Sequence, residues 1–395
     1  MGRKLALPLL LFAAANLFMG LKAGLYDTSF NNYLFQVHNV TEVARGGLEF
    51  PREMPGALTV LIFSLLAFLP DTRVALIAAL LAGIGLWGQG FLAPELNMVV
   101  VWMLIWSTGA HLFLVLKSSI ALRMAKEGQE GTLLGKLGAL EAGGTLIGMA
   151  TVYWGVSKFD FSFGVIFGIA GACAFIAALS LFIIKPQPIN IPRQPLLLKK
   201  KYSLYYGLNI LFGARKQIFL TFAPWVLIKM FNCGLETFAI LGIIGTSISL
   251  AFRPLLGKAI DVLGEKVILI GEALVLIAIC IFYAFAPTWF AADLALMVIF
   301  ICYIIDQLLL AVSMARTTYL NRIADKPEDV APTISMGITL DHIISMIIPL
   351  GGGLLWAACG FEWVFIAAAV IALISLFLAF MVPDLSAKQQ ASPAA

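Results

Sequence analysis

The chain has 395 residues, of which 61% are hydrophobic and only 12% are charged, and its mean hydropathy is +0.97. Soluble globular proteins carry roughly 25% charged residues, so this chain has too few to cover a surface that faces water. The 26 basic and 22 acidic residues are spread over short segments rather than gathered in one patch, which argues against nucleic-acid binding. Five widely spaced cysteines and three histidines have no metal-ligand spacing, so neither a metal nor another cofactor nor a disulfide framework is expected.

Apolar stretches long enough to cross a lipid bilayer as a helix recur about twelve times. The first starts like a signal peptide, with Arg3 and Lys4, but its apolar character continues to about Tyr33 and predicts a transmembrane helix. The sequence therefore predicts an all-α integral membrane protein. The predicted spans are 5–33, 47–69, 74–92, 98–122, 133–156, 161–184, 204–228, 236–252, 267–286, 290–315, 330–357 and 363–382.

A proline-rich basic segment, 185–203, separates the sixth span from the seventh and is too polar to cross the membrane. We therefore predict an N-terminal six-helix half, 1–184, a cytoplasmic linker, 185–203, and a C-terminal six-helix half, 204–395. Most lysines and arginines fall on one side of the predicted topology, and such an excess is typical of the cytoplasmic side. Both termini are therefore predicted to be cytoplasmic, in a multi-pass protein of the plasma (inner) membrane.

Polar residues repeat between the two halves at offsets of 193, 199 and 200 residues. One such match could arise by chance, but three in the same order indicate two homologous six-helix halves. The matched pairs are Asn16 and Asn209, Gly20 and Gly213, Lys22 and Arg215, Lys117 and Arg316, Arg123 and Arg322, and Glu141 and Asp341.

The segment from Gly257 to Lys266 resembles the cytoplasmic loop signature of the major facilitator superfamily, with glycine, aspartate, glycine and a basic residue at the same spacing. Its counterpart between spans two and three keeps the aspartate and a basic residue but lacks both glycines. The resemblance implies a secondary transporter whose two halves rock around a central binding site. The residues expected to act in gating are Asp71, Arg73, Gly257, Asp261, Gly264, Lys266, Lys117 and Arg316.

Charged residues inside apolar spans are costly and are therefore candidates for function. Lys22 and Arg215 occupy matched positions and predict a cavity with positive charge, although Lys22 could equally form a salt bridge with Asp27 or with an acid of another helix. Polar residues on two faces of the first span predict that this helix is buried against protein or a wet cavity. The residues expected to bind substrate are Lys22, Tyr26, Asp27, Arg215, Asp306 and Gln307.

A polar stripe along the eleventh span contains Asp341, with Ser345 one helical turn on, and Glu141 and Thr145 repeat that spacing in the fifth span. A buried carboxylate can change its protonation with its surroundings, so proton coupling is expected at Asp341, His342 and Glu141. Asp341 is expected to be solvated in one state of the carrier and paired with Arg215 or Lys22 in the other. The alternative is that Glu141 and Asp341 only neutralise buried cations. An outer gate network is expected from Arg52 with Glu49 or Glu53.

The predicted function is secondary transport of a small solute by a monomer, coupled to H+ or to exchange of a second solute. The matched cations resemble those of the organophosphate–phosphate antiporter branch of the superfamily and fit an organic anion. The leading alternative is a multidrug/proton antiporter, since 29 phenylalanines allow an apolar cavity. An integral-membrane enzyme would need a nucleophile–base pair or a metal cluster, and neither is visible in the sequence, so the protein is not expected to be an enzyme. A sensor derived from a transporter is a remote alternative.

Overall fold

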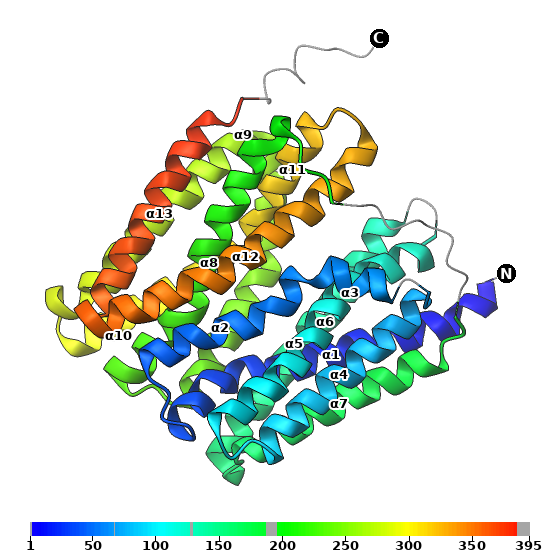
Figure 1. Ribbon diagram of the computed structural model, residues 1–395, viewed down its shortest axis with the longest axis horizontal. Helices are drawn as coiled ribbons and strands as arrows, with labels where there is room; N and C mark the ends of the chain where they lie inside the picture. The colour runs from blue at the N-terminus through cyan, green and yellow to red at the C-terminus, as the bar shows by residue number, and fades with distance from the viewer. Residues whose placement is uncertain (1, 67, 127–128, 187–195, 385–395) are drawn as a thin grey trace. The chain divides into compact units, whose positions relative to one another are not determined.

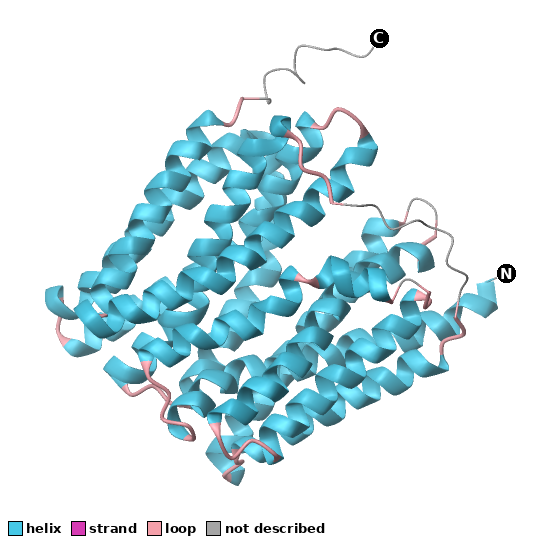
Figure 2. Ribbon diagram, in the orientation of Figure 1, coloured by secondary structure: helices cyan, strands magenta, loops and turns pink. Residues whose placement is uncertain are grey.

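The computed structural model of the protein describes residues 2–66, 68–126, 129–186 and 196–384, and these form helices and connecting loops without strands (Figure 2). Most of the predicted linker, 187–195, lies outside the described residues. The helices are α1 (Gly2–Gln36), α2 (Glu42–Ala57), α3 (Thr59–Leu65), α4 (Asp71–Phe91), α5 (Leu96–Met124), α6 (Glu130–Phe159), α7 (Phe163–Ile183), η1 (Lys200–Tyr202), α8 (Ser203–Phe231), α9 (Leu235–Trp289), α10 (Ala292–Leu309), η2 (Leu310–Val312), α11 (Ser313–Ile323), α12 (Pro327–Cys359) and α13 (Phe361–Met381).

These helices follow the predicted spans and confirm the all-α membrane class. Within the described residues, eight helical stretches are long and apolar enough to cross a membrane, and the 55 residues of α9 cover two predicted spans. The other predicted spans, α2 with α3, α6 and α8, carry many of the candidate polar residues, such as Glu141 on α6 and Arg215 on α8.

The largest difference from the sequence prediction is in α9. A cytoplasmic loop was predicted between spans eight and nine, but the chain stays helical through Gly257 and Asp261. The direction changes at Gly264, whose backbone angles are φ 80° and ψ 160°. Glycine adopts this conformation readily because it has no Cβ. The prediction of a loop before Gly264 is wrong, and the segment between the two glycines contains no proline or glycine that would end the helix.

Two other spans are interrupted. Pro51 and Pro55 lie inside α2, and the helix ends at Ala57 before α3 begins at Thr59. A proline removes one backbone hydrogen bond and clashes with the preceding turn, so a break here is expected. In the tenth span, the short 3₁₀ helix η2 separates α10 from α11. A 3₁₀ stretch in mid-helix often marks a hinge.

The contacts divide the chain into two compact units. The N unit comprises Met1–Val40, Pro51–Pro192 and Cys233–Thr246, and the C unit comprises Thr41–Phe50, Arg193–Asn232 and Ser247–Ala395. Each unit thus contains a short segment from the opposite half of the sequence, namely the start of α2 and the start of α9. The predicted boundary at 185–203 stays a prediction.

Within the N unit, α1 packs against α6 and α7, and α4 packs against α5 and α7 (Figure 1). Backbones of α1 and α6 touch directly, because Gly20 of α1 faces the carbonyl of Glu141 and Gly144 of α6 faces the carbonyl of Leu17. In the C unit, α8 packs against α12 and α13 (Figure 1). Small residues at helix interfaces let membrane helices approach this closely.

The repeat predicted from the sequence is visible in matching contacts. Thr145 Oγ1 on α6 lies 3.2 Å from the carbonyl oxygen of Gly20, and Ser345 Oγ on α12 lies 3.4 Å from that of Gly213. Both hydroxyls are placed to donate a hydrogen bond. The same residue types therefore join the first helix of each half to its fifth.

Gly144→Ala is expected to destabilise the protein by about 1–3 kcal/mol, the usual cost of overpacking a tight contact. An added Cβ would meet the Leu17 carbonyl and would lie 2.9 Å from the Leu21 amide nitrogen, both of which are backbone atoms that cannot rotate away. The adjacent Gly143→Ala is the control, because no heavy atom would lie within 4 Å of its Cβ. Thermal unfolding of the purified variants in one detergent measures the difference, and equal unfolding temperatures would contradict this helix contact.

Candidate functional site

The first helix is buried on both of its polar faces, as predicted. Lys22 is 5% exposed, and Tyr26, Ser29 and Tyr33 are buried as well. Asp27 is the exception, since its side chain is exposed between buried neighbours. A carboxylate within a transmembrane helix is too costly to face lipid, so Asp27 must face water.

Aromatic and amide side chains surround the buried face of α1. The Tyr26 hydroxyl donates to Gln89 Oε1 on α4 at 3.1 Å, and the Tyr26 ring lies 4.3 Å from the Trp106 ring on α5. Lys22 Nζ lies 5.5 Å from the centre of the Trp106 ring, within cation–π range. Gln89 and Trp106 were not predicted as site residues. Gln89 could have been predicted as a site residue, because it places a polar amide inside the apolar third span.

Lys117 and Glu141 form an ion pair between α5 and α6. Lys117 Nζ lies 2.6 and 2.8 Å from the two carboxylate oxygens of Glu141, and both side chains are partly exposed. Lys117, which was predicted for gating, and Glu141, which was predicted for proton coupling, therefore belong to one ion pair. Lys22, in contrast, has no carboxylate oxygen within 4 Å among the described residues, although Asp27 and Glu141 lie near enough to influence its charge.

A second polar group in the N unit joins α2 to α5. Arg52 Nη2 lies 3.0 Å from Glu53 Oε1, and the Arg52 carbonyl accepts a hydrogen bond from Ser107. His111 Nε2 lies 3.9 Å from Glu53 Oε2, while its Nδ1 lies within hydrogen-bond distance of Ser107. Arg52 and Glu53 thus pair as predicted. Ser107 and His111 complete the group.

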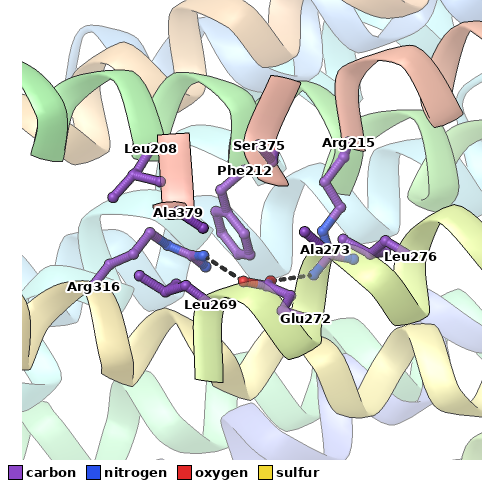
Figure 3. Close-up of a pocket in the computed structure, with 10 residues that line it drawn as sticks. All are labelled: Leu208, Phe212, Arg215, Leu269, Glu272, Ala273, Leu276, Arg316, Ser375 and Ala379. Atoms are coloured by element: carbon purple, nitrogen blue, oxygen red, sulfur yellow. Dashed lines mark hydrogen bonds and ion pairs between the residues drawn. The ribbon is translucent and has the colours of Figure 1, made fainter. Parts of the chain in front are cut away.

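In the C unit, Arg215 lies between two carboxylates. Its Nη1 donates to Asp306 Oδ1 at 2.6 Å and its Nη2 to Glu272 Oε1 at 3.3 Å. Glu272 also accepts from Arg316 Nη1 at 2.9 Å, so two guanidinium groups share it (Figure 3). The sequence indicated no partner for Arg215 within its own span, and Glu272 was missed. A single acid within the apolar run 267–286 was the available signal.

Asp341 pairs with Lys216. The Nζ of Lys216 lies 2.7 and 2.9 Å from the Asp341 oxygens, and the Ser345 hydroxyl lies 3.1 Å from Asp341 Oδ1. The expected partner of Asp341 was Arg215 or Lys22, but Arg215 lies one residue before Lys216 on α8 and points to different acids. The Phe212 ring contacts all three cations of this cluster, with Arg316 stacked closest at 3.9 Å.

The start of α2 adds a fully buried group to the C unit. Arg45 pairs with Glu49, and Glu49 Oε2 accepts a hydrogen bond from Gln217 Nε2 at 2.6 Å. The remaining candidates in this unit are Gln307, which is half-buried on α10, and His342, which is buried on α12.

Two of the predicted gating residues, Asp71 and Arg73, lie in the first turn of α4. Asp71 begins α4, where a negative charge favours the helix dipole, and it accepts hydrogen bonds from Ser119 at 2.9 Å and Arg123 at 2.8 Å. Arg73 donates to the carbonyl of Phe182 at 2.9 Å. These contacts tie α4 to α5 and α7.

The C unit uses a different acid at the equivalent place. Arg322, which matches Arg123 in the repeat, pairs with Glu265 at 2.8 Å rather than with Asp261 of the signature. Asp261 is exposed, Lys266 is half-buried, and a Cβ at Gly257 would meet no atom within 4 Å. The gating roles of these residues stay predictions.

The charges inside each unit are balanced. In the N unit, the clusters around Lys22, Arg52 and Lys117 contain three basic and three acidic side chains. In the C unit, the clusters around Arg45, Arg215 and Lys216 contain four of each. These residues are Lys22, Arg52, Lys117, Asp27, Glu53 and Glu141 in the N unit, and Arg45, Arg215, Lys216, Arg316, Glu49, Glu272, Asp306 and Asp341 in the C unit.

Comparison with known proteins identifies the family and the fold. The family described as Major Facilitator Superfamily matches residues 54–330. A crystal structure of the nucleoside transporter NupG is similar, with a TM-score of 0.72 at 15% identity, covering 98% of this chain and 100% of that chain. The xylose transporter XylE from E. coli gives a TM-score of 0.69 at 13% identity, with 96% and 100% covered. A bacterial homologue of the lysosomal transporter Spinster gives 0.69 at 13%, with 98% of each chain covered. No curated protein sequence matches significantly.

Proposed function

The chain belongs to the major facilitator superfamily, and we propose that it carries a small polar solute without net charge together with a proton. The family and the fold are those of secondary transporters, so coupling of two solutes by alternating access is the expected mode of action. The distribution of lysine and arginine supports cytoplasmic termini. The plasma (inner) membrane as its location and the single chain as the working unit are part of the same proposal.

The observation that carries the choice of solute is the charge balance of the two units. To bind at Arg215 or at Lys216, an organic anion would have to displace Asp306 and Glu272 from the one or Asp341 from the other. Separating a buried ion pair is costly, because each charge loses its compensation. An uncharged solute that forms hydrogen bonds requires no such exchange. Proteins of similar fold include a nucleoside transporter and a D-xylose–proton symporter, whose named solutes are uncharged.

Proton coupling is proposed at the two ion pairs that water can reach. Lys216 and Asp341 are 15% and 14% exposed, and Lys117 and Glu141 are 23% and 31% exposed. Arg215 and Asp306 are only 2% and 3% exposed. A coupling carboxylate has to exchange protons with water, so Asp341 and Glu141, which are equivalent in the repeat, suit this role better than Asp306.

An organic anion is the second candidate, and Lys22 favours it. This buried amine has no carboxylate oxygen within 4 Å among the described residues, so a carboxylate or phosphate group of a solute could pair with it without breaking an ion pair. The alternative predicted from the sequence, a multidrug exporter, is tested by the same uptake experiment, described next.

Uptake into proteoliposomes tests the proposal. Labelled nucleosides and pentoses, organic phosphates and dicarboxylates, and a cationic dye are offered with a one-unit pH gradient. We expect an uncharged solute to accumulate up to about ten-fold, the limit for one proton per solute, and a protonophore to abolish this. Lys22→Gln should leave that uptake largely intact. Accumulation of an organic anion that Lys22→Gln removes would instead establish the second candidate, and proton-driven movement of the dye would establish an exporter.

A further inference from the structure

A small, partly open cavity in the C unit lies beside the shared carboxylate of Glu272 (Figure 3). Its wall is apolar apart from Arg215, Glu272, Arg316 and Ser375, and its volume is about 20 Å³. A cavity needs roughly 10–15 Å³ to hold one water molecule. There is room for one water or one monatomic ion, but not for an organic solute.

The two arginines that line this cavity have hydrogen-bond donors to spare. Arg316 uses Nη1 on Glu272, and its Nε and Nη2 have no hydrogen-bond partner. Arg215 uses both terminal nitrogens, and its Nε has no partner. The side chains are 4% and 2% exposed, so outside water does not satisfy them. An unpaired buried donor costs about 1–3 kcal/mol, and more when it is charged.

The groups in this cavity that have no hydrogen-bond partner are all donors of Arg215 and Arg316. Both oxygens of Glu272 already accept from a guanidinium group, and the Ser375 hydroxyl donates to the carbonyl of Ile371. Arg316 stacks on the face of the Phe212 ring, 3.9 Å from its centre. Stacking directs the N–H groups along the plane of the guanidinium, away from the ring. The cavity therefore favours a ligand that accepts several hydrogen bonds.

We propose that this cavity binds one small monovalent anion, such as chloride or bromide. A halide accepts from several N–H donors at once, whereas a water molecule would bring two more protons that need acceptors. Because the cavity lies within one unit and is too small for a transported solute, the anion is a resident ligand. Its binding is independent of which solute the protein carries.

Charge balance links the anion to a proton. The surrounding group holds Arg215 and Arg316 against Glu272 and Asp306, so it is neutral before an anion enters. Protonation of either carboxylate restores neutrality once the anion is bound, so the halide should bind more tightly as the pH falls. By linkage, the halide favours protonation to the same degree. The other ionisable groups facing this cluster are Cys280 and Cys302 near Asp306, and Tyr205 and Asp341 near Arg316.

Bromide is the probe for this site. The purified full-length protein is unfolded thermally in sodium bromide and in sodium gluconate of equal ionic strength, at pH 6 and at pH 8. We expect bromide to raise the unfolding temperature, and its dissociation constant to be at least about five-fold lower at pH 6. Crystals soaked in bromide should show its anomalous signal within hydrogen-bond distance of Arg316.

Two substitutions at one position supply the control. Ser375→Val adds a methyl group at the cavity wall and should abolish the bromide effect, whereas Ser375→Ala leaves the cavity open and should retain it. Both variants keep all four charged residues, so both should fold. An unfolding temperature that is the same in bromide and gluconate at both pH values would overturn the proposal and leave water as the ligand. So would an unchanged bromide effect in Ser375→Val.

Discussion

Arg215→Gln is expected to destabilise the C unit by about 3–5 kcal/mol, the usual cost of removing one partner of a buried ion pair. The Arg215 side chain is 2% exposed and contacts Asp306 and Glu272. Without it, Asp306 loses the cation 2.6 Å away and remains as a buried, uncompensated charge. Since a whole domain is stable by only about 5–15 kcal/mol, the variant should accumulate poorly in the membrane. Membrane yield and thermal unfolding of the purified protein measure the effect.

Asp306→Asn in the same chain should restore much of the lost stability. The double variant removes both charges of the pair, and Glu272 keeps Arg316 as its partner. A double-mutant cycle then gives the coupling energy of Arg215 and Asp306 directly. Arg253→Gln is the matched control, because this arginine is exposed on α9. If Arg215→Gln accumulates and unfolds like the control but no longer transports, the arginine binds solute and its ion pairs do not hold the unit together.

Sequence reasoning predicted the repeat but not the partners of its charges. The offset of 193 residues aligns Arg215 with Lys22 and Lys216 with Ala23. The N half therefore has no cation where Lys216 pairs with Asp341, and Glu141 pairs with Lys117 instead. Equivalent backbone contacts are present at Gly20 in the N half and at Gly213 in the C half, because these contacts depend on small residues at fixed helical positions. The ion pairs were rearranged, since a long side chain can reach any of several acids.

The partners of Arg215 also could not be predicted because they are remote in the sequence. Asp306 is 91 residues away and Glu272 is 57 residues away, on two other helices. Helical periodicity shows which residues share a face of one helix. It does not show which face of another helix packs against them. Burial of α1 was predictable, because its polar residues occupy two faces and both needed protection from lipid.

The continuous helix α9 shows a different limit. Composition separates apolar spans from polar segments, and the signature segment is polar enough to be predicted as a loop. Helix formation depends instead on backbone freedom and local propensity, which this segment satisfies up to Gly264. The signature glycine at that position was predictable, but its role as the single point of bending required the structure.

Asp341→Asn is expected to abolish accumulation of solute under a pH gradient while exchange of solute for solute continues. Asparagine has the shape of the protonated aspartate but cannot release a proton. A carrier with this substitution can still bind and reorient, so labelled solute inside should exchange with unlabelled solute outside. Net accumulation should fall from as much as about ten-fold, at one unit of pH difference, to equilibration, because one pH unit corresponds to about 1.4 kcal/mol for one proton.

The variants to compare are Glu141→Gln and Asp306→Asn, assayed in the same proteoliposomes. Glu141 occupies the equivalent place in the N half and is paired with Lys117, so its loss should weaken coupling if both halves take part. Asp306 is buried against Arg215, so Asp306→Asn should reduce the yield of folded protein more than it changes coupling. If Asp341→Asn concentrates solute as the parent does, Asp341 is not the coupling group. Asp27 would then be the next candidate, because it is a carboxylate exposed in the middle of α1.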